Sequence, residues 1–217
     1  MEFWGVMSDA LPTLLKGLSY TVLIALASLV LATIIGLFAG LMRISGNVIL
    51  RSVAAAYINL IRGTPLLIQI LFIYFGLPTV FHVNFSPLAA GIFAVSINIG
   101  AYLAEVFRAG IESIDRGQME AGRSLGFSYA VAMRLIILPQ AVRRMTPAFI
   151  NQFIIGIKDT SMLSVIGVAE LTMEGQSIYA MNFKSFEILT LVGLMYFIIN
   201  YALTVASRWV EKKVAVS

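Results

Sequence analysis

Four consecutive polar residues, Lys158, Asp159, Thr160 and Ser161, interrupt a long apolar segment in the last third of the chain. Charged side chains at the depth of a lipid bilayer are costly, and they usually face the interior of a helix bundle or a watery cavity. Neighbouring residues leave a helix in different directions, so Lys158 and Asp159 should face different surroundings, unless the helix breaks there and offers backbone groups to a ligand. We favour substrate binding for this cluster; the alternative is that Lys158 reaches the outer interface while Asp159 caps or pairs structurally.

A second polar group lies on another apolar segment, where Asn98, Tyr102 and Glu105 recur at helical spacing. This spacing places the three side chains on one stripe of a helix. Asn98 and Tyr102 offer hydrogen bonds suited to a zwitterion or an amide, and we expect them to bind substrate. Glu105 and Arg108 lie nearer the end of the segment and could pair as a gate. The alternative, which we prefer for this pair, is a hydrogen bond between helices that holds the bundle together.

The residue types needed for covalent chemistry are scarce. The chain has no cysteine and one histidine, His82, which we place in a short outer loop. This set provides neither a metal cluster nor a nucleophile with its base, which argues against an intramembrane enzyme. The phosphate-binding pattern G-x-x-x-x-G-K-S/T is absent. We therefore expect no cofactor on this chain, and any ATP that drives it, with its Mg, must bind another chain.

The composition indicates an all-α membrane protein. Of the 217 residues, 59% are hydrophobic and 12% are charged, and the mean hydropathy is +0.92, which excludes an ordinary soluble domain. The net charge of +4 does not indicate nucleic-acid binding, because the basic residues follow loops rather than one stripe. We predict a single transmembrane domain over residues 1–217. Its five transmembrane helices are expected at about 17–42, 53–80, 88–107, 145–168 and 188–207.

The first residues predict a surface helix rather than a signal peptide. Glu2 and Asp9 stand where the basic region of a cleavable signal would lie. Apolar residues at near-helical spacing, among them Phe3, Met7 and Leu14, indicate an interfacial helix. This helix is expected to lie along the membrane before the chain enters the first span.

The basic residues set the orientation of the predicted spans. One side of the membrane would hold Arg43, Arg51, Arg62, the six arginines of 108–144, Arg208, Lys212 and Lys213, and the other side only Lys16 and Lys184. Lysine and arginine concentrate in cytoplasmic loops. The amino terminus is therefore predicted outside, the carboxyl terminus in the cytoplasm, and the long loop 108–144 in the cytoplasm.

The cytoplasmic loop 108–144 contains an amphipathic stretch at 119–140. Its residues predict a short helix, a turn at Gly126, a second short helix and a stop at Pro139. The second helix would present an apolar face to the membrane or to a partner. That face consists of Tyr129, Ala132, Met133, Ile136 and Ile137.

The same stretch resembles the signature loop of the membrane subunits of bacterial ATP-driven (ABC) importers. The order E-A-A, three residues, G, nine residues and I-x-L-P is present with its spacing intact, and Gly122 replaces the second alanine. In that family the loop docks into a cleft on a separate ATP-hydrolysing subunit. The resemblance implies ATPase coupling through Glu120, Ala121, Gly122, Leu125, Gly126, Phe127 and Pro139, with Leu125 and Phe127 exposed as apolar knobs. The alternatives are an ordinary amphipathic loop and a passive channel, which would have no use for a docking loop.

The resemblance extends over nearly the whole chain and narrows to the polar amino-acid permeases. It rests on 62–66 (RGTPL), Asn98, Tyr102 and Glu105, the loop motif, 157–161 (IKDTS) and 165–172 (VIGVAELT). The pattern is most similar to the glutamine-type permeases, in a branch that also includes histidine and arginine importers. Some members bind the amino acid at mid-membrane through positions that match Asn98, Tyr102, Asp159 and Ser161.

This resemblance implies an assembly as well as a fold. The fold would be that of a type I ABC importer permease in the bacterial inner membrane. The partners would be a second permease subunit (a copy of this chain or a close relative), two ATPase subunits and an extracytoplasmic amino-acid-binding protein. The substrate would be a polar amino acid, either glutamine-like or basic, such as arginine or histidine.

Overall fold

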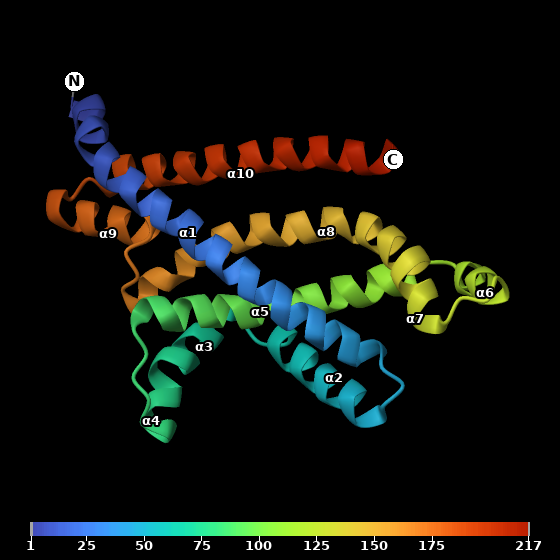
Figure 1. Ribbon diagram of the computed structural model, residues 1–217. Helices are drawn as coiled ribbons and strands as arrows, with labels where there is room; N and C mark the ends of the chain where they lie inside the picture. The colour runs from blue at the N-terminus through green and yellow to red at the C-terminus, as the bar shows by residue number, and fades with distance from the viewer. Residues whose placement is uncertain (1, 217) are drawn as a thin grey trace.

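The computed structural model describes residues 2–216, with side chains described for 4–210, and every regular element in that range is helical (Figure 1). The α-helices are α1 (Glu2–Ile44), α2 (Val48–Arg62), α3 (Leu66–Leu71), α4 (Leu77–Phe81), α5 (Pro87–Glu112), α6 (Arg116–Ser124), α7 (Tyr129–Ala132), α8 (Leu138–Asp159), α9 (Leu171–Asn182) and α10 (Ser185–Val216). Two π-helical turns, η1 (Phe72–Gly76) and η2 (Met133–Ile137), and the 3-10 segment η3 (Thr160–Ile166) complete the order. The predicted all-α class is confirmed.

Helices α1 and α5 cross at the centre of the molecule with their backbones almost in contact (Figure 1). Small residues recur at the crossing, with Gly36 and Gly40 on α1 facing Gly100 and Ala104 on α5. A Cβ on Gly36 would lie 2.9 Å from the carbonyl oxygen of Gly100, and a Cβ on Gly40 would lie 3.0 Å from that of Ala104. Small residues at this spacing permit the close approach that is typical of helices in membranes. The crossing holds α5, which carries the polar stripe, firmly against α1.

The apolar core surrounds α5. Its buried members come mainly from α1, α3, η1, α5 and η3 and include Ile24, Ile70, Val95, Ile99, Leu103 and Leu163. A second cluster joins the start of α1 to α9 and α10 through Leu14, Leu171 and Ile188, which are fully buried. The first cluster packs α5 against α1 and α3, and the second packs the start of α1 against α9 and α10.

The segment 165–172 has a structural role at the start of α9. Gly167, with φ of 79°, reverses the chain after η3 in a conformation that glycine adopts without strain. Glu170 is fully buried and caps α9, since its carboxylate accepts hydrogen bonds from the backbone N–H groups of Thr172 and Met173. The hydroxyl of Tyr196 on α10 donates to the same carboxylate at 2.8 Å. These bonds tie the connection before α9 to α9 itself and to α10.

The amino-terminal segment is not a separate interfacial helix, contrary to the prediction. Helix α1 runs without interruption through 43 residues and accommodates Pro12 in its interior. Such a helix is about 65 Å long, about twice the thickness of a bilayer's hydrocarbon core. Ala10 and Leu14 are buried against α9 and α10, so tertiary packing fixes the direction of this end. The side chain of Phe3 lies outside the described side chains.

The predicted second span, 53–80, is bent rather than straight. The helical run from α3 to α4 leaves α2 at an angle of 105°. Pro65 precedes α3, and the residue before a proline, here Thr64, is disfavoured in helical conformation. Gln69 closes the bend, because its Nε2 donates to the carbonyl oxygens of Ile61 at 2.8 Å and Thr64 at 3.1 Å.

Pro139 does not end the second helix of the loop, contrary to the prediction. The chain stays helical from α7 through η2 and α8, and the N–H of Leu138 donates to the carbonyl oxygen of Met133, five residues earlier. This widened π-helical turn makes room for the proline that follows it, which would clash with a regular preceding turn. The same arrangement occurs after η1, where Pro78 follows Leu77.

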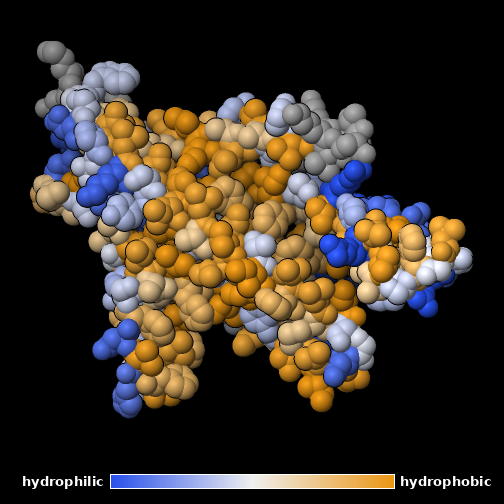
Figure 2. All heavy atoms as spheres, in the orientation of Figure 1, coloured by the Kyte–Doolittle hydropathy of each residue, from blue (hydrophilic) through white to orange (hydrophobic). Residues whose placement is uncertain are grey.

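An apolar surface covers the middle of the molecule. Hydrophilic residues gather around the start of α1 and α9 and around α6, and apolar residues dominate between them (Figure 2). Three helical segments are long and apolar enough to cross a membrane, namely Trp4–Ile44, Pro87–Glu112 and Ser185–Val210, and the bent pair α2–α4 would make a fourth. Helix α8, which has charged residues near both ends, is not among them. The count of five spans and the span 145–168 therefore stay predictions.

Candidate functional site

A cavity of about 350 Å³ lies where the α2–α3 bend meets α5 and α8. Three of the predicted substrate residues line it together, Asn98 and Tyr102 from α5 and Asp159 from the end of α8. Its volume lies in the range of sites for small molecules. The other lining residues are Thr64, Pro65, Leu66, Ile99, Gln152 and Ile155.

Asn98 is held in this cavity by Gln69, which was not predicted to lie at the site. Its Nδ2 donates to Oε1 of Gln69 on α3 at 2.9 Å, and both side chains are buried. Gln69 is also the residue that closes the α2–α3 bend. A signal was present in the sequence, since Gln69 is the one amide within the apolar run 65–73. A lone amide in such a run needs a buried partner.

The rest of the polar cluster at the end of α8 points elsewhere. Lys158 is exposed and does not line the cavity that Asp159 lines, so the two neighbouring charges face different surroundings. Thr160 and Ser161 do not line it either, and their hydroxyls donate to the carbonyl oxygens of Ile157 at 2.8 Å and Lys158 at 2.7 Å. The helix tightens into η3 after Asp159 instead of breaking. Asp159 is the member of the cluster that meets the cavity.

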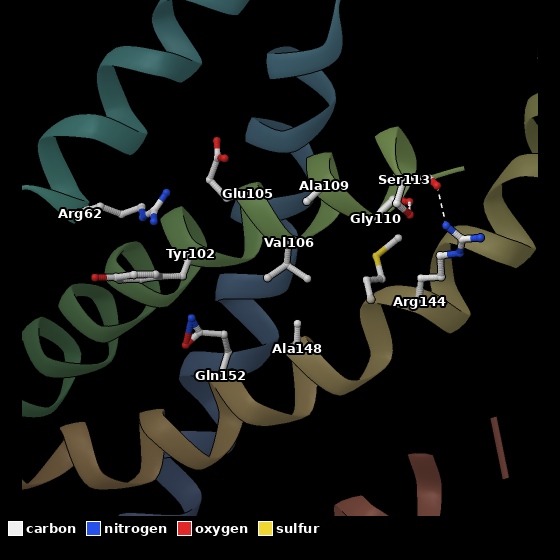
Figure 3. A pocket seen from close by; sticks show the side chains of 11 residues that line it. Arg62, Tyr102, Glu105, Val106, Ala109, Gly110, Ser113, Arg144, Ala148 and Gln152 are labelled. Carbon is white, nitrogen blue, oxygen red and sulfur yellow. Dashed lines mark hydrogen bonds between the residues drawn. The ribbon is translucent and has the colours of Figure 1, made fainter. Parts of the chain in front are cut away.

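A second cavity of about 500 Å³ shares Tyr102 and Gln152 with the first and continues toward the loop end of α5 (Figure 3). Arg62 of α2 lies at their border, with its guanidinium carbon 5.2 Å from the centre of the Tyr102 ring, a cation–π contact. At the far end Arg144 of α8 donates to the carbonyl oxygen of Ser113. Gln152 and Arg144 were not predicted to lie at a site, because no local spacing links them to α5.

The predicted Glu105–Arg108 pair is present, but both of its members belong to α5. The Arg108 Nη2 and the Glu105 Oε2 are 2.7 Å apart, and Arg108 also pairs with Glu112 one turn further on. The contribution from another helix comes from Arg43 of α1, whose Nε lies 4.0 Å from Glu105. Glu105 also lines the second cavity, whereas Arg43, Arg108 and Glu112 do not, so Glu105 is the member of this group of charges that meets the cavity.

The loop after α5 presents a tight turn with exposed apolar residues. Gly126 adopts φ of 88°, a left-handed conformation that side chains other than that of glycine rarely take. Leu125 is 77% exposed and Phe127 is 37% exposed, so both project from the turn as predicted. Arg123 donates to the carbonyl oxygen of Phe127 across the turn. Glu120, Ala121 and Pro139 are exposed on either side of it.

The apolar face of the second loop helix is used mostly within the chain. Ala132 and Ile137 are buried, and Ile137 packs with Ile114 and Met145 against the end of α5. Gly122 of α6 is buried as well, since a Cβ there would lie 2.7 Å from Cδ1 of Ile136. Four members of the face predicted for the membrane or a partner therefore attach the loop to its own bundle, whereas Tyr129 stays exposed. The turn at 125–127 is exposed as well.

Comparison with known proteins identifies the family. Residues 32–216 match the family described as binding-protein-dependent transport system inner membrane component. The chain is 43% identical to the glutamine transport system permease protein GlnP of Escherichia coli over 218 aligned positions, which cover 100% of both chains. It is 34% identical to the arginine transport system permease protein ArtQ of Bacillus subtilis, covering 94% of this chain and 93% of that one.

Solved structures agree with this match. A chain from the crystal structure of an amino acid ABC transporter with histidines superposes with a TM-score of 0.91 at 38% sequence identity, covering 95% of this chain and 96% of that chain. The MetNI methionine ABC transporter in an inward-facing conformation shares the fold, with a TM-score of 0.80 at 20% identity over 94% of this chain and 97% of that chain. The chain therefore belongs to the family of inner membrane components of binding-protein-dependent transport systems, the permease subunits of ABC importers, and is similar to its glutamine-type members.

Proposed function

We propose that this chain forms the translocation pathway for a polar amino acid in an ATP-driven importer. The observation that carries the proposal is the cavity in which Asn98 and Tyr102 of α5 meet Asp159 of α8. Polar groups at this depth replace part of the water that an amino acid loses when it enters the membrane. The second cavity, bordered by Arg62 and Glu105, would continue the path toward the cytoplasm.

The substrate is a glutamine-like or a basic amino acid in this proposal. The relatives named for glutamine and arginine transport support this class. The cavity supports it too, since the Asp159 carboxylate and the Asn98 amide can both accept hydrogen bonds from an ammonium, an amide or a guanidinium group. The chain carries no covalent chemistry in this scheme, and Asn98, Tyr102 and Asp159 bind and orient the substrate.

The energy comes from a partner in this proposal. ATP and Mg bind to separate ATPase subunits, which dock on the exposed turn at 125–127 and on Glu120. The exposure of Leu125 and Phe127, beside an α6 that is anchored through Gly122, supports this role, since a rigidly held turn can transmit a displacement to α5 and α8. A second permease subunit (a copy or a close paralogue) and an extracytoplasmic amino-acid-binding protein complete the assembly.

The orientation in the inner membrane follows the charges. We place the amino terminus outside and the carboxyl terminus in the cytoplasm. Lys212 and Lys213, which contribute to this assignment, lie outside the described side chains. The start of α1 lies beside α9 at one end of the molecule, and α10 runs toward the end where α6 and α7 lie (Figure 1). Arg116, Arg123 and Arg134 on the α6–η2 side support a cytoplasmic position for that end.

Co-purification and uptake test the function together. The chain, expressed with its ATPase and binding-protein partners, should bring down an ATPase subunit and support ATP-dependent uptake of labelled L-glutamine or L-arginine in proteoliposomes. Glu120→Lys should abolish uptake while the chain still inserts into the membrane. An intramembrane enzyme would bring down no ATPase, and a passive channel would take up substrate without ATP; either result would refute the proposal.

Cysteine labelling tests the orientation. The chain has no natural cysteine, so a cysteine at Asn84, in the loop between α4 and α5, gives a single reporter. A membrane-impermeant maleimide should label it in intact spheroplasts, and a cysteine at Ser45, between α1 and α2, should react only after permeabilisation. The reverse labelling pattern would show that the chain has the opposite orientation in the membrane.

A further inference from the structure

The amide of Asn98 faces the cavity with one end fixed. An asparagine side chain has an oxygen that accepts hydrogen bonds and a nitrogen that donates them, so its orientation decides what a ligand meets. Nδ2 of Asn98 is engaged by Gln69 at 2.9 Å, and Oδ1 accepts no hydrogen bond within the described part of the chain. Within that part of the chain, the fully buried side-chain oxygen or nitrogen that has no hydrogen-bond partner is Oδ1 of Asn200, and Oδ1 of Asn98 is not such an atom. Oδ1 of Asn98 is therefore open to the cavity.

This orientation is dictated by Gln69. Nε2 of Gln69 lies 2.8 Å from the carbonyl oxygen of Ile61 and 3.1 Å from that of Thr64. Both are backbone oxygens, which can only accept, so the nitrogen of Gln69 must face them and its oxygen must face Asn98. Because the Gln69 oxygen that faces Asn98 can only accept a hydrogen bond, Asn98 must turn its donor, Nδ2, toward it. The chain of bonds from the α2–α3 bend thus leaves Oδ1 as the group that Asn98 shows to a ligand.

We propose that Gln69 is a positioning residue that makes the cavity an acceptor site for the substrate's α-ammonium group. Oδ1 of Asn98 and the carboxylate of Asp159 line the same cavity and are both acceptors. An ammonium group supplies three donors and a positive charge, and every amino acid carries it whatever its side chain. Gln69 does not line this cavity and acts through Asn98. The inference rests on the proposed function, since it assumes that the cavity holds an amino acid.

The test measures binding to the intact permease–ATPase complex in nanodiscs without the binding protein, so that the permease alone discriminates. The probes are L-glutamine and L-arginine, each paired with the analogue that lacks the α-ammonium group, 4-carbamoylbutanoic acid and 5-guanidinopentanoic acid. The wild type should bind each amino acid at least about tenfold more tightly than its analogue, as expected for a charge-assisted hydrogen bond. Gln69→Leu should lower this affinity ratio about tenfold for both pairs. The affinity for the amino acids should fall, and the affinity for the analogues should stay within about twofold of the wild type.

Two further variants separate positioning from folding. Asn98→Asp has oxygens at both ends and needs no partner to orient it, so Gln69→Leu combined with Asn98→Asp should restore the ratio. Gln140 is a matched control. Its Nε2 also donates to a backbone carbonyl oxygen, that of Ile136 at 2.9 Å, and to the amide oxygen of Gln118 at 3.3 Å. Unlike Gln69, it lies near the loop and away from the cavity. Gln140→Leu should leave both ratios unchanged.

The outcomes distinguish this inference from the proposed function. If the wild type binds neither amino acid, the mid-membrane site is refuted and the inference with it. A second outcome is that the wild type prefers the amino acids over their analogues, while Gln69→Leu leaves that affinity ratio unchanged or lowers both affinities equally. In that case the site stands and Gln69 only closes the bend. A loss of discrimination that Asn98→Asp does not reverse would also assign Gln69 to the bend alone.

Discussion

The turn at 125–127 and the cavity between α2, α5 and α8 are built in opposite ways. The turn shows its apolar side chains to solvent, and its shape depends on the backbone of Gly126. The cavity is lined by Asn98, which is 7% exposed and has its amide fixed by Gln69. An exposed turn can be recognised through shape alone, whereas buried polar groups must be matched by a ligand, a neighbour or water. Changes in the turn should therefore act through geometry, and changes in the cavity through unpaired polar groups.

The largest effect is expected at the turn. Gly126→Val places a β-branched residue at φ of 88°, where strain costs on the order of 1–3 kcal/mol. The backbone should relax to a different turn and displace Leu125 and Phe127, so uptake in proteoliposomes should be lost while membrane insertion is retained. ATP hydrolysis by the complex should continue without responding to substrate.

Gly46 provides the matched control for this change. It lies in the short connection between α1 and α2, its φ is outside the left-handed region, and a Cβ there would meet nothing within 4 Å. Gly46→Val should therefore leave uptake close to that of the wild type. Normal uptake by Gly126→Val would show that the shape of the turn is not what the ATPase recognises.

The turn could be predicted from the sequence because its determinants are contiguous. The glycine, the two apolar residues beside it and the short helix before it occupy one short stretch, and each acts through local conformation. Residue types alone predict that Pro139 ends the helix, whereas the π-helical turn η2 accommodates it. That outcome depends on where the preceding N–H groups find acceptors, and residue types do not reveal this.

The second largest effect is expected in the cavity. Asn98→Leu removes the donor to Gln69 and the acceptor that faces the substrate, which leaves polar groups unpaired. Each unpaired buried group costs about 1–3 kcal/mol, so half-maximal uptake should require roughly tenfold to hundredfold more substrate-loaded binding protein. Ser96→Ala is the control, because the Ser96 hydroxyl is buried on the same helix but bonds the carbonyl oxygen of Ile92 in its own helix. Equal effects of the two changes would show that helix packing, not the cavity, is responsible.

A smaller effect that depends on substrate is expected at Asp159. Asp159→Asn keeps the shape of the side chain and removes its charge, so uptake of L-arginine should suffer more than uptake of L-glutamine. For L-glutamine the loss should be on the order of 1 kcal/mol, the net value of one ordinary hydrogen bond. Lys158→Met, next in sequence but outside the cavity, should change neither. Uptake of both substrates at the wild-type rate and affinity in Asp159→Asn would place the site elsewhere.

The cavity could be predicted only in part. Helical spacing correctly joined Asn98 and Tyr102, because both lie on one regular helix. Spacing gave no means to connect them with Gln69 or Gln152, since those contacts depend on the 105° bend after α2 and on how α8 crosses α5. Thr160 and Ser161 were expected at the site as members of the polar cluster 158–161, and Ser161 also from the family resemblance. In the structure, η3 directs their hydroxyls to backbone carbonyl oxygens.

The smallest effect is expected at Gly122, and it tests whether this loop tolerates the usual family residue. A Cβ added there would lie 2.7 Å from Cδ1 of Ile136 and 3.2 Å from Cβ of Ala132. The closer atom is the end of a flexible side chain that can rotate away, so Gly122→Ala should keep uptake within about twofold of the wild type. Gly122→Leu cannot be accommodated in this way, because the larger side chain would separate α6 from η2 and tilt the exposed turn. If Gly122→Ala abolishes uptake as fully as Gly126→Val, then the ATPase recognises a geometry that is set by the contact between α6 and η2 and not by the left-handed turn.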